Sequence, residues 1–416
     1  MLKAGALYYA IMVSFLVALL SGFLLLSVWF HHYHTMYQLQ GLRLERNVSS
    51  AITMAIEAPG ITTLEQTVSV DLFNDEENVV NVTKKQWGGF YLLKAEAAWQ
   101  KLTHSAIAMC GMDIFCDDST ALYLADKERY LSISGSTLLN GNCYIPKLGI
   151  RRAYIEGKSY TGDELIHGKT QTSKSNLPEP DPLFTSANKI YLEGNSFPND
   201  SMLSILRLEK ADTFVNSFYR KTVVFYSSQW ITIGKKIIKG NVKIVSDKGI
   251  TMGNKAEVKD IIVYAPKIET ESGFSGTLQM FARDTLIVRE GTRLKFPSLI
   301  GIVEATCKNP LIDIKANSQI AGDVILLTSK TDNQPEVIIG ENAEINGRIY
   351  CDGRLQLKGK VYGGVYCKGF VLKTATSVYE NHLLDVTIDF QKLSKYYSGS
   401  GIFKVTDRYK MIQWAY

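Results

Sequence analysis

The chain has few of the residues from which catalytic and metal sites are usually built. Its 416 residues include only six cysteines and six histidines, and no CxxC pair or Cys/His set has the spacing of a zinc site. No GxSxG, phosphate-loop or helix-opening GxGxxG motif is present. We therefore expect no catalytic residue, no cofactor and no metal, and we predict that the protein is not an enzyme.

The cysteines are also too few for a disulfide scaffold in a chain of this length. Cys110 and Cys116 are close enough in the sequence to form one disulfide, which would suit an oxidising compartment. Two buried free thiols are an equally good interpretation of this pair.

Charge is neither abundant nor concentrated. The formal net charge is +5, and the 46 lysines and arginines are scattered, so we expect no nucleic-acid partner. His31, His32 and His34 cluster beside a long apolar run. A polar collar at a membrane surface explains them better than a metal site does.

The segment from Leu7 to Phe30 contains no charged residue and is long enough to cross a bilayer as a helix. Aromatic residues lie near both of its edges, as is common at membrane interfaces: Tyr8, Tyr9, Trp29 and Tyr33. A cleaved signal peptide is the alternative, but its apolar part should be shorter and end in small residues. We therefore predict a retained single-pass anchor whose partner is the lipid bilayer.

Residues 1–60 are expected to form this anchor and a stem helix. Apolar residues from Leu39 to Ile56 recur mostly three or four positions apart, and Pro59-Gly60 then ends the helix. Alternating and apolar stretches follow, which predict a small antiparallel meander sheet over 61–130.

The most informative pattern lies between Val337 and Gly369. RIYCDG at 348–353 returns as GVYCKG at 364–369, a spacing of 16. Repeated short apolar strands at coil length are typical of stacked β-solenoids. We expect residues from adjacent coils to form a ladder, with Tyr350 beside Tyr366 and Cys351 beside Cys367.

A related nine-residue pattern recurs upstream, at 250–258, 286–294, 312–320 and 337–345. Four glycines share a place near these repeats, where a tight corner would need positive φ: Gly141, Gly240, Gly322 and Gly347. We predict a mainly β fold with a right-handed parallel β-helix over 131–385. It would be interrupted by an inserted helix near 203–219 and followed by a C-terminal tail at 386–416. An antiparallel sandwich with glycine-rich hairpins is the alternative. Asp313, Asp323 and Asp332 share no register within the repeats.

The repeat resembles bactofilins, which are polymer-forming bacterial β-helix proteins. The resemblance covers 312–370 well and 223–311 loosely. The residues that carry it are Val337, Ile339, Gly340, Ile345, Gly347, Ile349, Gly359, Val361 and Gly364. About 200 non-repeat residues precede the best repeats, so filament formation does not transfer from the resemblance.

The first residues, MLKAG followed by an apolar helix, resemble type IV pilin-like proteins. The resemblance implies prepilin-type cleavage after Gly5 and a body outside the cytoplasm. Ala10 stands where most pilins carry glutamate, an acid that capping minor pseudopilins also lack.

Together these features predict a single-pass, non-catalytic structural subunit of a bacterial envelope apparatus, pilus-like, secretory or on the surface. Its partners would be other proteins of that assembly, including copies of itself. A cytoplasm-facing bactofilin-like scaffold and a surface carbohydrate-acting β-helix enzyme are the two alternatives.

Overall fold

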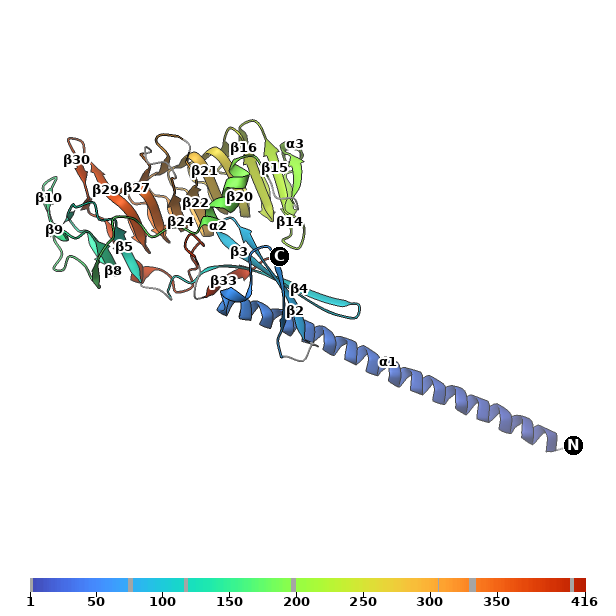
Figure 1. Cartoon of the computed structure of the whole chain (residues 1–416). Helices are drawn as coiled ribbons and strands as arrows, with labels where there is room; N and C mark the ends of the chain where they lie inside the picture. Colours follow the sequence, from blue (N-terminus) through green and yellow to red (C-terminus); the bar gives the residue numbers. More distant parts are fainter. Residues whose placement is uncertain are drawn as a thin grey trace.

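A long helix leads away from a β-rich body in the computed structural model (Figure 1). The structure describes residues 3–73, 78–115, 119–195, 200–305, 307–328, 334–404 and 408–416. The chain is mainly β, with one N-terminal apolar helix, an antiparallel sheet and a large set of parallel strands.

Helix α1 runs without interruption from Lys3 to Glu57. A short 3₁₀ turn, Pro59–Ile61, follows it directly. Proline cannot continue the hydrogen-bonding pattern of a helix interior, so the helix ends where Pro59 predicts.

The antiparallel sheet has the strand order β1-β2-β3-β4-β33. Its strands are β1 (Thr67–Asp71), β2 (Val79–Trp87), β3 (Phe90–Trp99), β4 (Leu102–Met112) and β33 (Tyr409–Trp414). The chain leaves the sheet at Met112 and returns opposite it at Tyr409. All the chain between them is therefore inserted between two neighbouring strands of one sheet.

The inserted residues form what we call the parallel body, β5 to β32. Its first part contains β5 (Thr120–Leu124), β6 (Leu131–Ser134), β7 (Leu138–Asn140), β8 (Asn142–Ile145), β9 (Ile150–Arg152), the small hairpin β10 (Tyr154–Ile155) and β11 (Lys158–Ser159), and β12 (Thr170–Thr172). Its second part begins with β13 (Ser201–Ser204), α3 (Ile205–Glu209), β14 (Thr213–Asn216), β15 (Val223–Ser227), β16 (Ile231–Ile233), β17 (Ile237–Gly240), β18 (Val242–Ser246) and β19 (Ile250–Met252).

The remaining strands of the second part complete the stack. They are β20 (Glu257–Thr270), β21 (Ser275–Val288), β22 (Arg293–Ile302), β23 (Leu311–Ile314), β24 (Gln319–Leu326), β25 (Glu336–Ile339), β26 (Glu344–Asn346), β27 (Ile349–Leu357), β28 (Lys360–Tyr362), β29 (Val365–Lys373), β30 (Val378–Glu380), β31 (His382–Leu384) and β32 (Thr387–Asp389), with a 3₁₀ turn at Phe390–Lys392.

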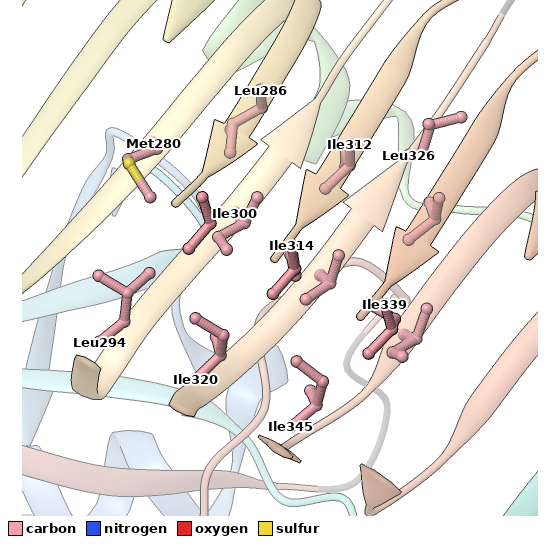
Figure 2. Packing of buried hydrophobic residues seen from close by; sticks show 14 of the residues in the cluster. Met280, Leu286, Leu294, Ile300, Ile312, Ile314, Ile320, Leu326, Ile339 and Ile345 are labelled. Carbon is pink, nitrogen blue, oxygen red and sulfur yellow. The ribbon is translucent and has the colours of Figure 1, made fainter. Parts of the chain in front are cut away.

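The repeated sequence patterns are stacked on one another in parallel register. Leu286 lies beside Ile312, Ile312 beside Val337, and Val337 beside Leu355. Their side chains point into one apolar interior, where Ile312, Ile314, Ile320, Ile339 and Ile345 are completely buried (Figure 2). The segment from Val337 to Gly369 thus pairs in parallel with its neighbours rather than folding into antiparallel hairpins.

The first and last parts of the body are joined to each other. Strand β5 lies in parallel beside β29, with Leu122 opposite Val365 and Leu124 opposite Cys367. Strand β7 lies beside β32 in the same way. Residues 119–172 therefore cap the end of the stack formed by the last repeats, and the strands that follow 200 begin at the other end (Figure 1).

Residues 173–195, which we call the crossing segment, connect these two ends along the outside of the body. The segment contains α2 (Pro182–Leu192), which Asp181 caps by accepting a hydrogen bond from the Leu183 N–H. Phe184 and Tyr191 of α2 are buried in a cluster with Tyr264 and Phe281 of the body.

Three expectations about element boundaries differ from the structure. The sheet does not extend to residue 130, because β5 belongs to the parallel body, and 386–416 is not a tail, because β32 and β33 lie within the two sheets. The expected helix at 203–219 is limited to α3, at Ile205–Glu209. Beyond α3, Phe214 pairs in parallel with Ile238 and packs its ring 4.9 Å from that of Phe225, so sheet pairing replaces the helix.

Candidate membrane stem and docking sites

The first half of α1 presents its apolar side chains outwards. Among residues 5–30 none is buried, and the helix is long and apolar enough to cross a membrane. Trp29 stacks on Tyr33 with ring centroids 5.6 Å apart at one edge of this run. One N-terminal apolar helix of this kind fits a single-pass membrane anchor.

The second half of α1 is the part that packs against protein. Leu44, Val48, Ala51, Ile52 and Ala55 are buried against the antiparallel sheet in one cluster. Their spacing of three or four residues places them on one face of the helix. The predicted stem residues from Leu44 onward are thus covered by the sheet, whereas Leu39 and Leu42 are exposed, as the anchor half is.

The histidine cluster beside the anchor lies on the exposed part of α1. Gln38 Nε2 and His34 Nε2 are 3.0 Å apart, and the rings of His34 and Phe30 are stacked. Within the described part of the chain, no group of three His, Cys, Asp or Glu residues could hold a metal ion.

A buried ion pair of the parallel body also binds residues 393–404, which lead back to the antiparallel sheet and which we call the returning chain. Arg348 Nη2 lies 2.8 Å from Asp323 Oδ2, and their side chains are 5% and 1% exposed. Asp323 also accepts hydrogen bonds from the Tyr397 hydroxyl at 2.6 Å and from the Ser400 N–H at 2.8 Å. Arg348 in turn donates to the Ser400 carbonyl at 2.7 Å. We call these four residues the hub.

Electrostatics favour the charged form of the hub. Burial acts to raise the pKa of Asp323, but the Arg348 charge and the hydrogen bonds from Arg348, Ser400 and Tyr397 outweigh it and lower that pKa below its usual value. Both charges are therefore retained in the interior. Asp323 and Arg348 follow the repeat glycines Gly322 and Gly347 and so occupy equivalent places in adjacent repeats. Tyr397 and Ser400 come from outside the repeats, so no local pattern could identify the whole hub.

A second contact docks the antiparallel sheet onto the body. At the turn between β2 and β3, the Gly89 N–H donates to Gln279 Oε1 at 2.6 Å, and Gln279 Nε2 donates to the Trp87 carbonyl at 3.0 Å. Gly88 has φ of +61°, and a Cβ there would lie 2.2 Å from Gln279 Oε1. The turn needs glycine both for its backbone conformation and for the close approach of Gln279.

The tyrosines expected to form a ladder lie in register. Tyr350 is opposite Tyr366 and Cys351 opposite Cys367, and the two tyrosine rings have centroids 6.5 Å apart. The stack continues through Tyr123 to Tyr144, with centroid distances of 6.1 and 5.3 Å. This extension crosses the junction between the last and first parts of the body, which the spacing of 16 could not predict.

The cysteine pair of this ladder is buried and free. Burial raises the pKa of the Cys351 thiol to about 12, and that of Cys367 well above its usual value. Both thiols are therefore protonated and unreactive at neutral pH. Cys110 is also buried, and its thiol lies 3.7 Å from the Tyr91 carbonyl. Cys116 lies outside the described residues, so the Cys110–Cys116 pair stays a prediction.

The four repeat glycines occupy places where the backbone has positive φ. The φ angles are +129° at Gly141, +88° at Gly240, +158° at Gly322 and +159° at Gly347. A Cβ at Gly240 would lie 2.1 Å from the Asn216 carbonyl oxygen of the neighbouring strand. Gly5 is exposed in α1, with nothing near its Cα that a Cβ would meet.

Comparison with known proteins returns little. No family model matches the chain, and no curated protein is similar to it. The resemblance to bactofilins thus stays a prediction. The competence-associated pilin ComZ from Thermus thermophilus is 11% identical over 85% of this chain and 86% of that chain, with a TM-score of 0.22. A TM-score this low does not show a shared fold.

Proposed function

We propose that the protein is a membrane-anchored structural subunit of a pilus-type assembly in the bacterial envelope, with its body outside the cytoplasm. The observation that carries the proposal is α1, a single helix of 55 residues. At 1.5 Å per residue it is a rod of about 80 Å. One half is uncovered and apolar, and the other half packs its buried face against a small antiparallel sheet.

The uncovered half supports membrane insertion followed by assembly. Its large apolar side chains are exposed around the whole helix, including Leu7, Phe15, Leu24 and Leu25. Lipid tails can cover such an apolar surface, and equivalent helices of other subunits can cover it as well. We therefore infer that copies of this chain or related subunits associate through this half of α1.

The insertion supports a role as an adaptor. The parallel body leaves and rejoins the sheet at paired residues, Met112 and Tyr409, so a large unit is added without changing the stem. We propose three units: the stem helix, the antiparallel sheet, and an inserted β-helix. Strands that pair in parallel with the strand of the next repeat support this coiling, and we propose the right-handed form on general chirality.

The anchor assignment is tested by removing residues 1–34 and washing membranes with carbonate. The truncated protein should leave the membrane fraction, because the first buried stem residue is Leu44. The full chain, treated in parallel, should remain. Retention of the truncated protein in the carbonate-washed membrane would contradict the anchor assignment.

The assignment to a pilus-type assembly is tested separately, by mass spectrometry of the N-terminal peptide of the mature chain. We propose processing after Gly5, so the mature chain should begin at Ala6 in its native host. Gly5→Leu should block processing, whereas Gly22→Leu, at another glycine of α1 where a Cβ would meet nothing within 4 Å, should not. An unprocessed wild-type chain would remove the support for a prepilin. Full protection of the body from protease in spheroplasts would instead favour the cytoplasmic scaffold.

A further inference from the structure

Residues 201–240, which we call the end segment, form the end of the parallel body that lies opposite the capped end. Its first strands, β13, β14 and β16, pair with the next coil through β15, β17 and β19. Helix α3 covers the apolar core there, because Leu208 is buried in the main cluster. The core is therefore closed by the chain itself, and the outer surface of the end segment is available for binding.

The end segment holds the whole net charge of the chain. It has seven cations and two acids, a net charge of +5, which equals the formal net charge of all 416 residues. The rest of the chain is therefore electrically balanced. Five of the seven cations are exposed and form no ion pair with another described residue: Arg207, Lys210, Arg220, Lys221 and Lys235. A concentration of unpaired cations attracts anionic partners.

Several of these cations lie together beside α3. Lys236 Nζ donates to the Glu209 carbonyl at 2.8 Å and to the Ala211 carbonyl at 2.9 Å. These bonds hold the loop that carries Lys235 and Lys236 against the end of α3, next to Lys210. The positive charge thus has a local centre on the surface.

Exposed apolar side chains lie among the cations. Leu206 and Val215 are each 60% exposed, and Met202, Tyr219 and Trp230 are 43–45% exposed. Met202 and Leu206 line one groove of about 500 Å³ at this end. Cations interleaved with apolar and aromatic side chains are typical of protein surfaces that bind at the level of lipid head groups.

The end segment lies on the side of the body towards which the anchor half of α1 runs, whereas β9 and β10 lie at the opposite end (Figure 1). Two hydrogen bonds hold it on the antiparallel sheet. The Phe218 N–H donates to the Tyr416 carbonyl at 3.2 Å, and the Tyr219 hydroxyl donates to the Ser105 carbonyl at 3.3 Å. Since the stem half of α1 packs against the same sheet, the end segment keeps a defined position relative to the anchor.

A second copy of the chain fits this surface poorly. Residues 142–172, at the capped end, also have more cations than acids, five against three. Stacking two bodies end to end would therefore bring like charges together. An acidic polysaccharide would neutralise the cations, but it offers no apolar surface to Leu206 and Val215. An anionic lipid surface supplies both phosphates and an apolar boundary.

We propose that the end segment binds anionic phospholipids of the membrane that holds α1, an inference that rests on the proposed anchor. Arg207, Lys210 and Lys235 would contact lipid phosphates, and Leu206 would enter the boundary between head groups and acyl chains. Transmembrane helices tilt by about 0–40° from the membrane normal. Binding would tilt α1 towards the body, so anionic lipid would set the orientation of the subunit.

The test is hydrogen–deuterium exchange of the full chain in nanodiscs of phosphatidylcholine alone or of an equal mixture with phosphatidylglycerol. Amides of residues 204–212 should exchange at least threefold more slowly in the anionic nanodiscs, and 0.5 M NaCl should remove this difference. Amides of the β10–β11 hairpin, at the opposite end, should exchange equally in both lipids. Equal exchange of 204–212 in the two lipids would overturn the proposal. Slower exchange of 204–212 on adding polyglutamate, but not with phosphatidylglycerol, would also overturn it and assign the surface to an acidic protein.

Two variants with the same change of charge locate the binding. The first should lose the effect of phosphatidylglycerol, and it combines three changes in the end segment: Arg207→Gln, Lys210→Gln and Lys235→Gln. The second should keep the effect, and it combines three changes of exposed lysines in the capped end: Lys127→Gln, Lys147→Gln and Lys169→Gln. An equal effect of phosphatidylglycerol on both variants would contradict the assigned surface.

Failure of the anchor is distinguishable from failure of the lipid proposal. A chain that does not enter nanodiscs, as judged by size-exclusion chromatography, would contradict the anchor assignment. Sedimentation of the same chain with vesicles of the two lipid compositions then decides the lipid proposal. Binding to the anionic vesicles that is at least threefold stronger would support it, and equal binding to both would overturn it. If the first variant does not fold, the lipid comparison on the wild-type chain still decides.

Discussion

Replacing Asp323 with asparagine should strongly destabilise the union of the parallel body with the returning chain. The substitution keeps the size of the side chain but removes its charge, which leaves the Arg348 guanidinium uncompensated at 5% exposure. It also places an amide NH₂ among donors, because the Arg348, Tyr397 and Ser400 groups around Asp323 all donate to it.

The magnitude follows from the burial of the pair. Removing one partner of a buried ion pair typically costs about 3–5 kcal/mol, because the remaining charge is left without water or a counterion. We expect Asp323→Asn to lower the free energy of unfolding by this amount. Urea unfolding of the full chain in detergent, followed by tryptophan fluorescence, measures the change.

A matched control uses another aspartate of the body. Asp313 pairs with Lys315 at 2.7 Å, but the lysine side chain is 47% exposed. Asp313→Asn should therefore cost less than about 1 kcal/mol. Combining Asp323→Asn with Arg348→Met should cost less than the sum of the two single changes, since they remove one interaction. A loss for Asp323→Asn no larger than that for Asp313→Asn would refute the reasoning.

Three further outcomes concern the core, a strand corner and a titrating group. Ile339→Ala should cost about 2–5 kcal/mol in urea unfolding, whereas Ile338→Ala, on the half-buried outer face of the same strand, should cost much less. Gly240→Ala should lower the free energy of unfolding by about 1–3 kcal/mol, because φ is +88° and the added Cβ would meet a carbonyl oxygen. The control Gly234→Ala should cost less, because its Cβ would meet nothing within 4 Å, and thermal unfolding compares the two variants. Burial lowers the pKa of Lys243 to about 8, from 10.5 in the unfolded chain. Burying the charged lysine therefore destabilises the folded protein fully below pH 8, and this destabilisation disappears as the pH rises towards 10.5. The stability of the wild type relative to Lys243→Met should therefore rise by about 2 kcal/mol between pH 8 and 9.5, and a constant difference would contradict the lowered pKa.

Local patterns in the sequence predicted those parts of the molecule that depend on short-range periodicity. An uncharged run from Leu7 to Phe30 can only be an exposed apolar helix or a buried one, and the continuation to Pro59 is amphipathic. The spacing of 16 placed Tyr350 beside Tyr366 because each repeat contributes one strand to the same sheet. Periodicity of this kind is visible in short stretches of the sequence, so it can be recognised without knowing which distant residues are in contact.

Only the tertiary structure decided how the first and last parts of the parallel body are joined, how the antiparallel sheet is completed, and where charge is buried. Leu122 pairs with Val365, and Met112 pairs with Tyr409. The two residues of each pair are far apart in the sequence, so they meet only after the intervening chain has folded. Asp323 and Lys243 resemble ordinary surface residues in the sequence. Their burial depends on the crossing segment, the returning chain and the antiparallel sheet, which cover the body from outside, and no local periodicity encodes which faces will be covered.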